Sequence, residues 1–80
     1  MPTFLLQHRH AAHECDAAFA AWEGFASPLR RATVDSTCLA GGHSLQWRVQ
    51  AADAGAALAL LPRFVAARTV AVEVRDVRVP

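Results

Sequence analysis

Six side chains that bind late transition metals fall in two short segments of this sequence. They are His8, His10, His13 and Cys15 in the segment HRHAAHEC, and Cys38 and His43 in the segment CLAGGH. Imidazole nitrogen and thiolate sulfur suit nickel, zinc or copper, whereas calcium and magnesium prefer oxygen. We therefore treat all six as candidate ligands of a transition metal ion (Ni, Zn or Cu).

The spacing of these residues is a weaker indication than a paired zinc knuckle, because no Cys-x2-Cys pair is present. His8 and His10 are two positions apart, so on a strand they point the same way and can chelate one ion, with Cys38 or His43 completing it. Each residue also has an ordinary interpretation. A histidine at a strand or helix end is commonly solvated, and a buried cysteine is commonly a small apolar side chain.

Alternation of apolar and polar residues predicts a first strand over residues 3–10. Residues 13–26 place Phe19, Trp22 and Phe25 at helical spacing and predict an amphipathic helix, which Ser27-Pro28 ends. His13 and Cys15 then stand at the start of that helix.

The Gly41-Gly42 dipeptide predicts a two-residue turn between two extended runs. The expected pairs across this hairpin are Ala40 with His43, Cys38 with Leu45, and Ser36 with Trp47. Cys38 and His43 would then lie on one face of the hairpin, close to its turn.

The rest of the chain predicts a second helix and a last strand. Asp53 is a suitable N-cap, Pro62 must end or kink the helix, and residues 63–67 continue as a turn or short helix. The valines of TVAVEVRDVRVP alternate and then slip by one position, which predicts a bulge near Arg75-Asp76.

The predicted order is strand, helix, strand, strand, helix, strand. It indicates an α+β class and a ferredoxin-like β-α-β-β-α-β fold, with a four-stranded antiparallel sheet in the order 4-1-3-2 and two helices on one face. Residues 1–80 are expected to form a single domain, because a chain of this length cannot support two cores.

This element order resembles the dimeric α/β-barrel superfamily, and distantly its small nickel-binding actinobacterial members. The resemblance covers the whole chain but includes no diagnostic motif. It implies that copies pair through their sheets. We expect a homodimer, because a single sheet with helices on one side leaves its other face open and an 80-residue core is marginal alone.

The predicted topology brings the two ligand segments to one edge of the sheet. The first strand ends there and the first helix begins there, while the hairpin turn returns to the same edge. The expected helix-covered face consists of Phe4, Leu6, Leu45, Trp47, Val49, Val70 and Val72. The expected open face carries Gln7, Arg9, Gln46, Arg48 and Glu73.

Composition narrows the classes of partner. The net charge is +1 and the arginines are scattered, which argues against a nucleic-acid protein. No apolar run reaches the roughly 20 residues that cross a bilayer, so no membrane partner is expected, and the N-terminal apolar stretch is too short for a secretory signal. We expect a cytoplasmic protein, with two cysteines that are too few for a disulfide framework.

Three functions fit these observations. The first is a small transition-metal-binding protein, a sensor, store or carrier. The alternative is an enzyme of the dimeric-barrel type, or a small-ligand-binding protein, whose histidine and cysteine cluster lines the pocket. The third is a partner-binding module in which Cys15 and Cys38 form a disulfide under oxidation.

Overall fold

The computed structural model describes residues 1–80 and contains one antiparallel sheet of four strands. The strands are β1 (Thr3–Arg9), β2 (Asp35–Ser36), β3 (Ser44–Gln50) and β4 (Thr69–Val74). Their order is β2-β3-β1-β4, which is 4-1-3-2 when read from the other edge. The α+β class and the four-stranded antiparallel sheet are confirmed.

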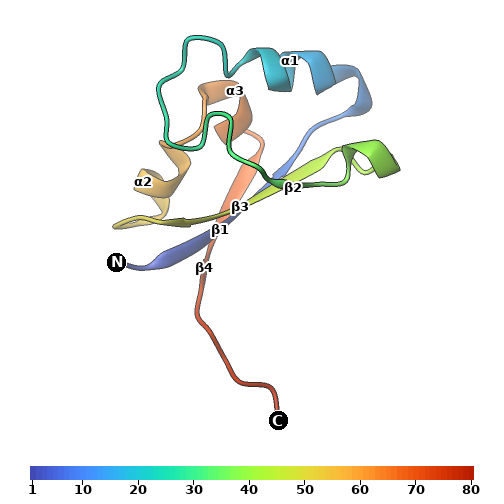
Figure 1. Cartoon of the computed structure of the whole chain (residues 1–80). Coiled ribbons are helices and arrows are strands. Elements are labelled where there is room, and N and C mark those ends of the chain that lie inside the picture. Colours follow the sequence, from blue (N-terminus) through green and yellow to red (C-terminus); the bar gives the residue numbers. More distant parts are fainter.

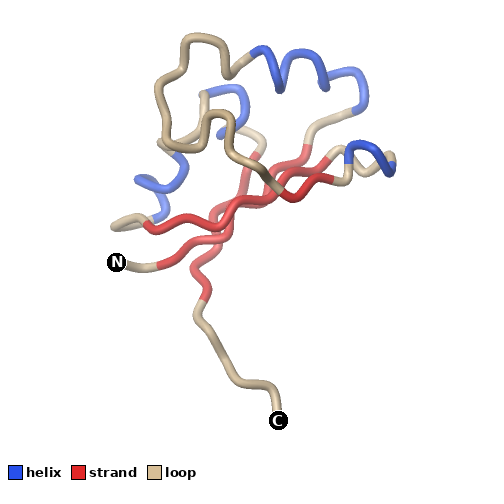
Figure 2. The backbone as a smooth tube through the Cα atoms, in the orientation of Figure 1, coloured by secondary structure: helices blue, strands red, loops and turns tan.

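Short helices cover one side of this sheet (Figure 1). Three are α-helices, α1 (Cys15–Ala20), α2 (Ala54–Leu58) and α3 (Arg63–Ala66). Two are single 3-10 turns, η1 (Ala12–Glu14) before α1 and η2 (Cys38–Ala40) between β2 and β3. The backbone trace shows that the other side of the sheet has no helix against it (Figure 2).

The first helix is shorter than the 13–26 range that the apolar spacing predicted. α1 ends at Ala20, and the chain tightens into turns in which the Trp22 and Glu23 amides donate to carbonyls three residues earlier. Gly24 follows with φ of +72°, a left-handed conformation that stops a right-handed helix. The predicted helix was therefore wrong beyond Ala20, although Trp22 still packs against the core.

The predicted hairpin register was wrong by two residues. Ser36, not Cys38, pairs with Leu45, and β2 is only two residues long. The Thr37 carbonyl accepts from the amides of Ala40 (2.9 Å) and Gly42 (2.8 Å), so residues 38–42 close into a 3-10 turn instead of extending the strand. Cys38 therefore lies in the turn rather than in the ladder.

The second helical segment begins at the predicted cap, but α2 ends at Leu58, earlier than the expected run through Leu61 to Pro62. The Asp53 side chain accepts a hydrogen bond from the Ala56 amide at 2.7 Å, which makes it the N-cap of α2. The segment breaks before Pro62, which cannot donate a backbone hydrogen bond, and α3 resumes as a short helix.

The side chains of β4 face the opposite way from the prediction. Val70 pairs with Gln7 and Val72 with Leu5, so both valines lie on the open face of the sheet. Ala71 and Glu73 occupy the covered face instead. The predicted bulge is absent, because regular pairing ends at Val74 and the last residues extend away from the domain (Figure 1).

The core lies between the sheet and the helices. Alternate residues of β1 and β3 enter it, and α2 and α3 close it. Its nine buried members are Phe4, Leu6, Leu45, Trp47, Val49, Ala51, Ala57, Leu61 and Val65. His8 and His10 continue the buried side of β1 beyond this apolar cluster, with 1% and 4% of their surface exposed. The core thus ends in histidines at one edge of the sheet.

Candidate metal centre

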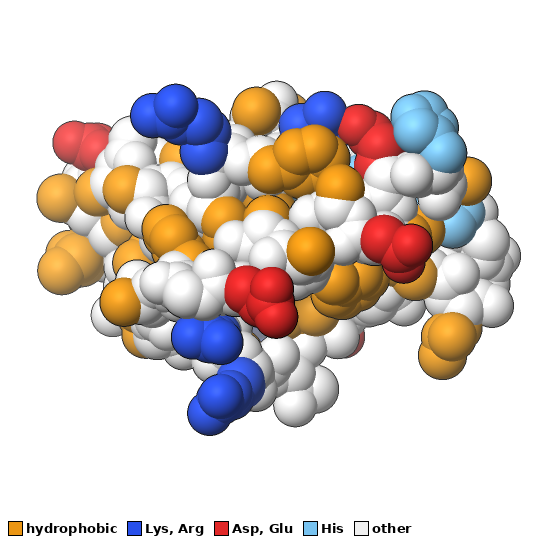
Figure 3. All heavy atoms as spheres, turned by 90° about the horizontal axis from the view of Figure 1, so that it is seen from above, with side chains coloured by type: hydrophobic (Ala, Val, Ile, Leu, Met, Phe, Trp, Pro, Cys, Tyr) orange, Lys and Arg blue, Asp and Glu red, His pale blue; other side chains and the backbone are white.

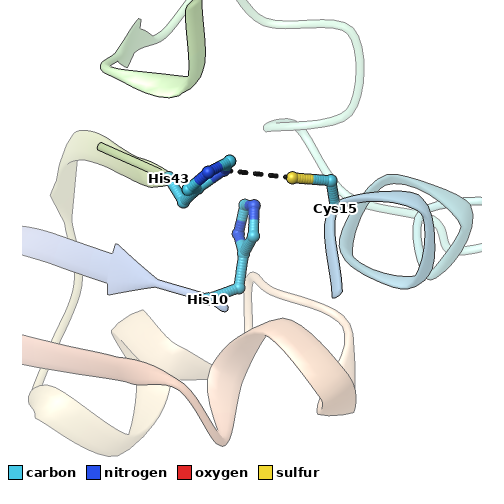
Figure 4. Close-up of side chains that lie close together, drawn as sticks. All are labelled: His10, Cys15 and His43. Carbon is cyan, nitrogen blue, oxygen red and sulfur yellow. Dashed lines mark hydrogen bonds between the residues drawn. The ribbon is translucent and has the colours of Figure 1, made fainter. Parts of the chain in front are cut away.

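Three side chains from three separate segments of the chain meet at this edge. His10 follows the last residue of β1, Cys15 is the first residue of α1, and His43 precedes β3. One donor atom of each lies within 4.8 Å of the other two (Figure 4). This group could hold a metal ion.

Backbone geometry holds the two histidines in place. The His10 amide donates to the His43 carbonyl at 3.1 Å, which continues the β1–β3 pairing one step past the ladder. His43 has φ of +53°, in the left-handed region that few residues with side chains adopt. Such strain is concentrated at functional sites, where the surrounding structure must enforce it.

An ion pair fixes the start of α1 and with it Cys15. The Glu14 carboxylate accepts hydrogen bonds from Arg68 Nη2 at 2.8 Å and Nε at 3.0 Å. It also accepts from the Ala11 amide at 2.9 Å. The Arg68 hydrogen bond is the largest cause that lowers the pKa of Glu14, followed by the amide bond. This pair ties the η1–α1 junction to the end of α3.

His8 lies behind His10 and orients it. The Val65 carbonyl, 3.2 Å from His8 Nδ1, can only accept, so that nitrogen carries the proton. His8 Nε2 then accepts from His10 Nδ1 at 2.9 Å, and a neutral His10 keeps its Nε2 lone pair free. Metal-bound histidines commonly donate from their other nitrogen in this way.

Burial keeps His8 neutral, as this chain of hydrogen bonds requires. Loss of solvation lowers the pKa of the His8 imidazole below its usual 6.5, against the opposing bond to the Val65 carbonyl. Electrostatic repulsion from the neighbouring His10 and from the Arg68 guanidinium lowers the His8 pKa further.

A second sulfur lies beside the three ligands. Cys38 Sγ is 4.0 Å from His10 Nε2, and Cys15 Sγ is 3.1 Å from His43 Nδ1. Both cysteines are free thiols and half-buried. In tetrahedral zinc sites with bonds of about 2.0–2.3 Å, neighbouring donors are about 3.3–3.8 Å apart. The Cys15–His43 separation is slightly below that range and the Cys38–His10 separation slightly above it, so Cys38 borders the three donors without belonging to the group that lies within 4.8 Å.

The six predicted ligands therefore take different positions. Three meet directly, Cys38 borders them, and His8 contacts His10 instead of reaching the group. His13 is exposed on η1 and belongs to no such group. Seen from the helix side, the histidine side chains gather at one end of the molecule (Figure 3).

Sequence reasoning missed the contacts that orient His8, although it placed Phe19 on the apolar stripe beside the site. The Val65 carbonyl and the Thr69 hydroxyl both lie 3.2 Å from His8 Nδ1. The Phe19 ring packs edge-on against His10, with the ring centres 6.4 Å apart. Backbone carbonyls carry no sequence signal, and the Thr69 contact depends on the β1–β4 register.

No family model, curated protein or solved structure matches this chain. None of its helices is long and apolar enough to cross a membrane. The geometry of the site is therefore the basis for inferring what this protein does.

Proposed function

We propose that this protein binds one late transition metal ion through His10, Cys15 and His43, with Cys38 as the fourth ligand. The observation that supports the proposal is that two imidazoles and a thiol from three separate segments of the chain have donor atoms within 4.8 Å of one another. A buried histidine behind His10 gives the site the supporting hydrogen bond that metal ligands usually have.

Zinc fits the proposed donor set best among nickel, zinc and copper. Two nitrogens and two sulfurs in a tetrahedral arrangement are typical of zinc. Binding converts the thiols to thiolates and so releases protons. Cys15, Cys38 and His43 are half-buried rather than enclosed, which lets the ion exchange with solvent. We therefore favour a store or carrier over a purely structural zinc site.

Cobalt substitution tests the proposal directly. Co2+ is added to reduced protein, and the charge-transfer absorption from thiolate to cobalt is followed, after which zinc displaces the cobalt. We expect saturation at one cobalt per chain. In Cys38→Ser the charge-transfer intensity should fall by about half, because one of two thiolate ligands is lost.

Matched histidine variants separate ligands from neighbours. His43→Asn removes a ligand while keeping a residue that tolerates a positive φ, and should weaken binding by at least about 100-fold, at the upper end of losses seen even for supporting residues. His13→Asn changes an exposed histidine of η1 and should leave affinity unchanged. Equal losses in both variants, or no stoichiometric uptake, would refute the proposal.

The finer fold and assembly follow as proposals. We propose a reduced ferredoxin-like fold related to the dimeric α/β barrels, which the strand order and the helices on one face support.

We also propose a homodimer that forms through the open face beside β4. Exposed Val70 and Val72 lie there, next to half-buried Leu5, on an edge strand with unpaired backbone groups.

A further inference from the structure

A cavity of about 370 Å3 lies between the end of α1, the 29–34 segment and β3. Seven of its ten lining residues are hydrophobic. Its walls include Phe19, Trp22, Leu29, Val34, Leu45 and Trp47. A space of this volume lies at the small end of the range that binds metabolite-sized molecules.

Two neighbouring tryptophans, Trp22 and Trp47, line this cavity. The rings of Trp22 and Trp47 have centres 5.9 Å apart and planes inclined by 45°. Phe25, which does not line the cavity, packs edge-on against Trp22 with ring centres 6.1 Å apart. Aromatic faces of this kind favour planar, apolar ligand groups.

The rim of the cavity carries a net positive charge. Arg30 and Arg31 line it together with one acidic residue, Glu23. The chain's ion pairs join Arg48 to Asp76, Arg68 to Glu14 and Arg75 to Glu73, so neither rim arginine has an acidic partner. Arginines without an acidic partner are suited to binding a carboxylate, with which a guanidinium group forms paired hydrogen bonds.

The segment that carries the arginines is held in a defined conformation. The Ser27 hydroxyl donates to the Leu60 carbonyl at 2.7 Å and so ties the segment to the residues after α2. The Arg30 amide donates to the Ser27 carbonyl at 3.1 Å. Arg31 has φ of +68°, a left-handed conformation that side chains disfavour. From the helix side, exposed hydrophobic side chains spread across the surface with basic groups at its margins (Figure 3).

We infer that this cavity binds a small aromatic carboxylate. The planar body would lie against Trp22 and Trp47, and the carboxylate would pair with Arg30 and Arg31. The inference does not depend on a bound metal, because none of these four residues belongs to the metal centre. Phe19 lines the cavity and also contacts His10, so a ligand there would lie beside that centre.

The test is a titration of metal-free, 15N-labelled protein with 2-naphthoate, followed by NMR. The two indole N–H resonances report on Trp22 and Trp47, which line the cavity. The indole N–H group of Trp47 has no hydrogen-bond partner within the chain. We expect both to shift together and saturate with one naphthoate bound. Neutral 2-naphthamide, which has the same rings, should bind about tenfold more weakly, because an ion-paired hydrogen bond is lost.

Variants of the rim residues give the second arm. Arg30→Gln combined with Arg31→Asn should weaken naphthoate binding about tenfold without changing the amide's affinity, and Asn is tolerated at a positive φ. Glu23→Gln should strengthen naphthoate binding, because it removes the opposing charge. Arg63→Gln, at an exposed arginine of α3 outside the cavity, is the matched control and should change nothing. Thermal unfolding confirms that each variant is folded.

Three results of this titration would overturn the inference. The inference is overturned if 2-naphthoate and 2-naphthamide bind with equal affinity. It is also overturned if the double arginine variant binds naphthoate as tightly as wild type. The third such result is an absence of indole shifts at millimolar naphthoate in folded wild-type protein. Because the protein is metal-free throughout, none of these results bears on metal binding.

Discussion

At the scale of single residues, His8 in β1 and His10 just after it have different roles, although they are two positions apart and lie on the same face of the sheet. His10 presents a free nitrogen to Cys15 and His43, while His8 is bonded to the Val65 carbonyl on one side and to His10 on the other. Strand alternation predicts that both are buried, and they are. It cannot predict which one reaches the ligand group, because that depends on the position of α1 and of the 38–43 turn.

Loss of the His8 acceptor should weaken metal binding. His8→Phe keeps a buried ring but leaves His10 Nδ1 without its partner, and supporting residues of this kind change affinity by about 10- to 100-fold. The measurement is competition between the protein and a chromophoric chelator for zinc. Thr69→Val removes only one of the two acceptors of His8 and should cost less. If His8→Phe binds zinc as tightly as wild type, the proposed hydrogen-bond chain has no role in binding.

The Glu14–Arg68 pair should make stability depend on pH in the acidic range. The pKa of Glu14 is lowered in the folded chain below its usual 4.5, so the unfolded chain takes up its proton first as pH falls. The stabilisation is therefore complete above pH 4.5 and disappears as pH falls through the folded pKa. We expect Glu14→Gln to lower the unfolding temperature of metal-free protein at pH 7. The difference from wild type should shrink at pH 3, and a constant difference would contradict this assignment.

At the scale of elements, the sequence correctly predicted the strands and the helix cap that have strong local signals. It failed for the elements whose conformation depends on contacts with distant residues. β1, β3 and the Asp53 cap follow from alternation and capping chemistry. The 38–43 turn does not, because Thr37 bonds to the Ser44 hydroxyl at 2.6 Å and closes a longer loop than Gly41-Gly42 suggests. The orientation of β4 was wrong for a related reason. A run of alternating valines does not show which alternate set faces the helices, because that depends on the β1–β4 register.

Gly42 lies so close to Thr37 that adding a single methyl group at position 42 should distort this turn. A Cβ at Gly42 would collide with the Thr37 side chain, so Gly42→Ala must displace the turn that holds Cys38 and His43. We expect zinc affinity to fall about tenfold or more, the lower end for a displaced ligand. Gly55→Ala in α2 is the control, since its Cβ meets only ordinary contact and alanine favours helix by about 1 kcal/mol. Equal zinc affinity in the two variants would show that the turn does not position the ligands.

At the scale of the whole molecule, the corrected direction of β4 changes the open face of the sheet. Glu73 does not lie there, as its pairing with Phe4 shows, and Val70 and Val72 do. Along β3 this face stays polar, with Gln46 and Arg48 exposed. The apolar half is therefore continuous with the unpaired edge of β4, which is the arrangement that favours pairing with a second copy.

Charges placed on that half should separate the proposed dimer. Val70 and Val72 are 62% and 41% exposed, so Val70→Lys with Val72→Lys changes little inside a monomer while it sets like charges against each other across a twofold interface. Sedimentation equilibrium should give a dimer for wild type and a monomer for this variant. Val77→Lys with Val79→Lys, in the extended C-terminal segment outside the sheet, is the matched control and should remain dimeric. Because the metal ligands all come from one chain, the monomeric variant should still take up one zinc ion. A wild-type monomer at high concentration would refute the proposed pairing and leave the metal site unaffected.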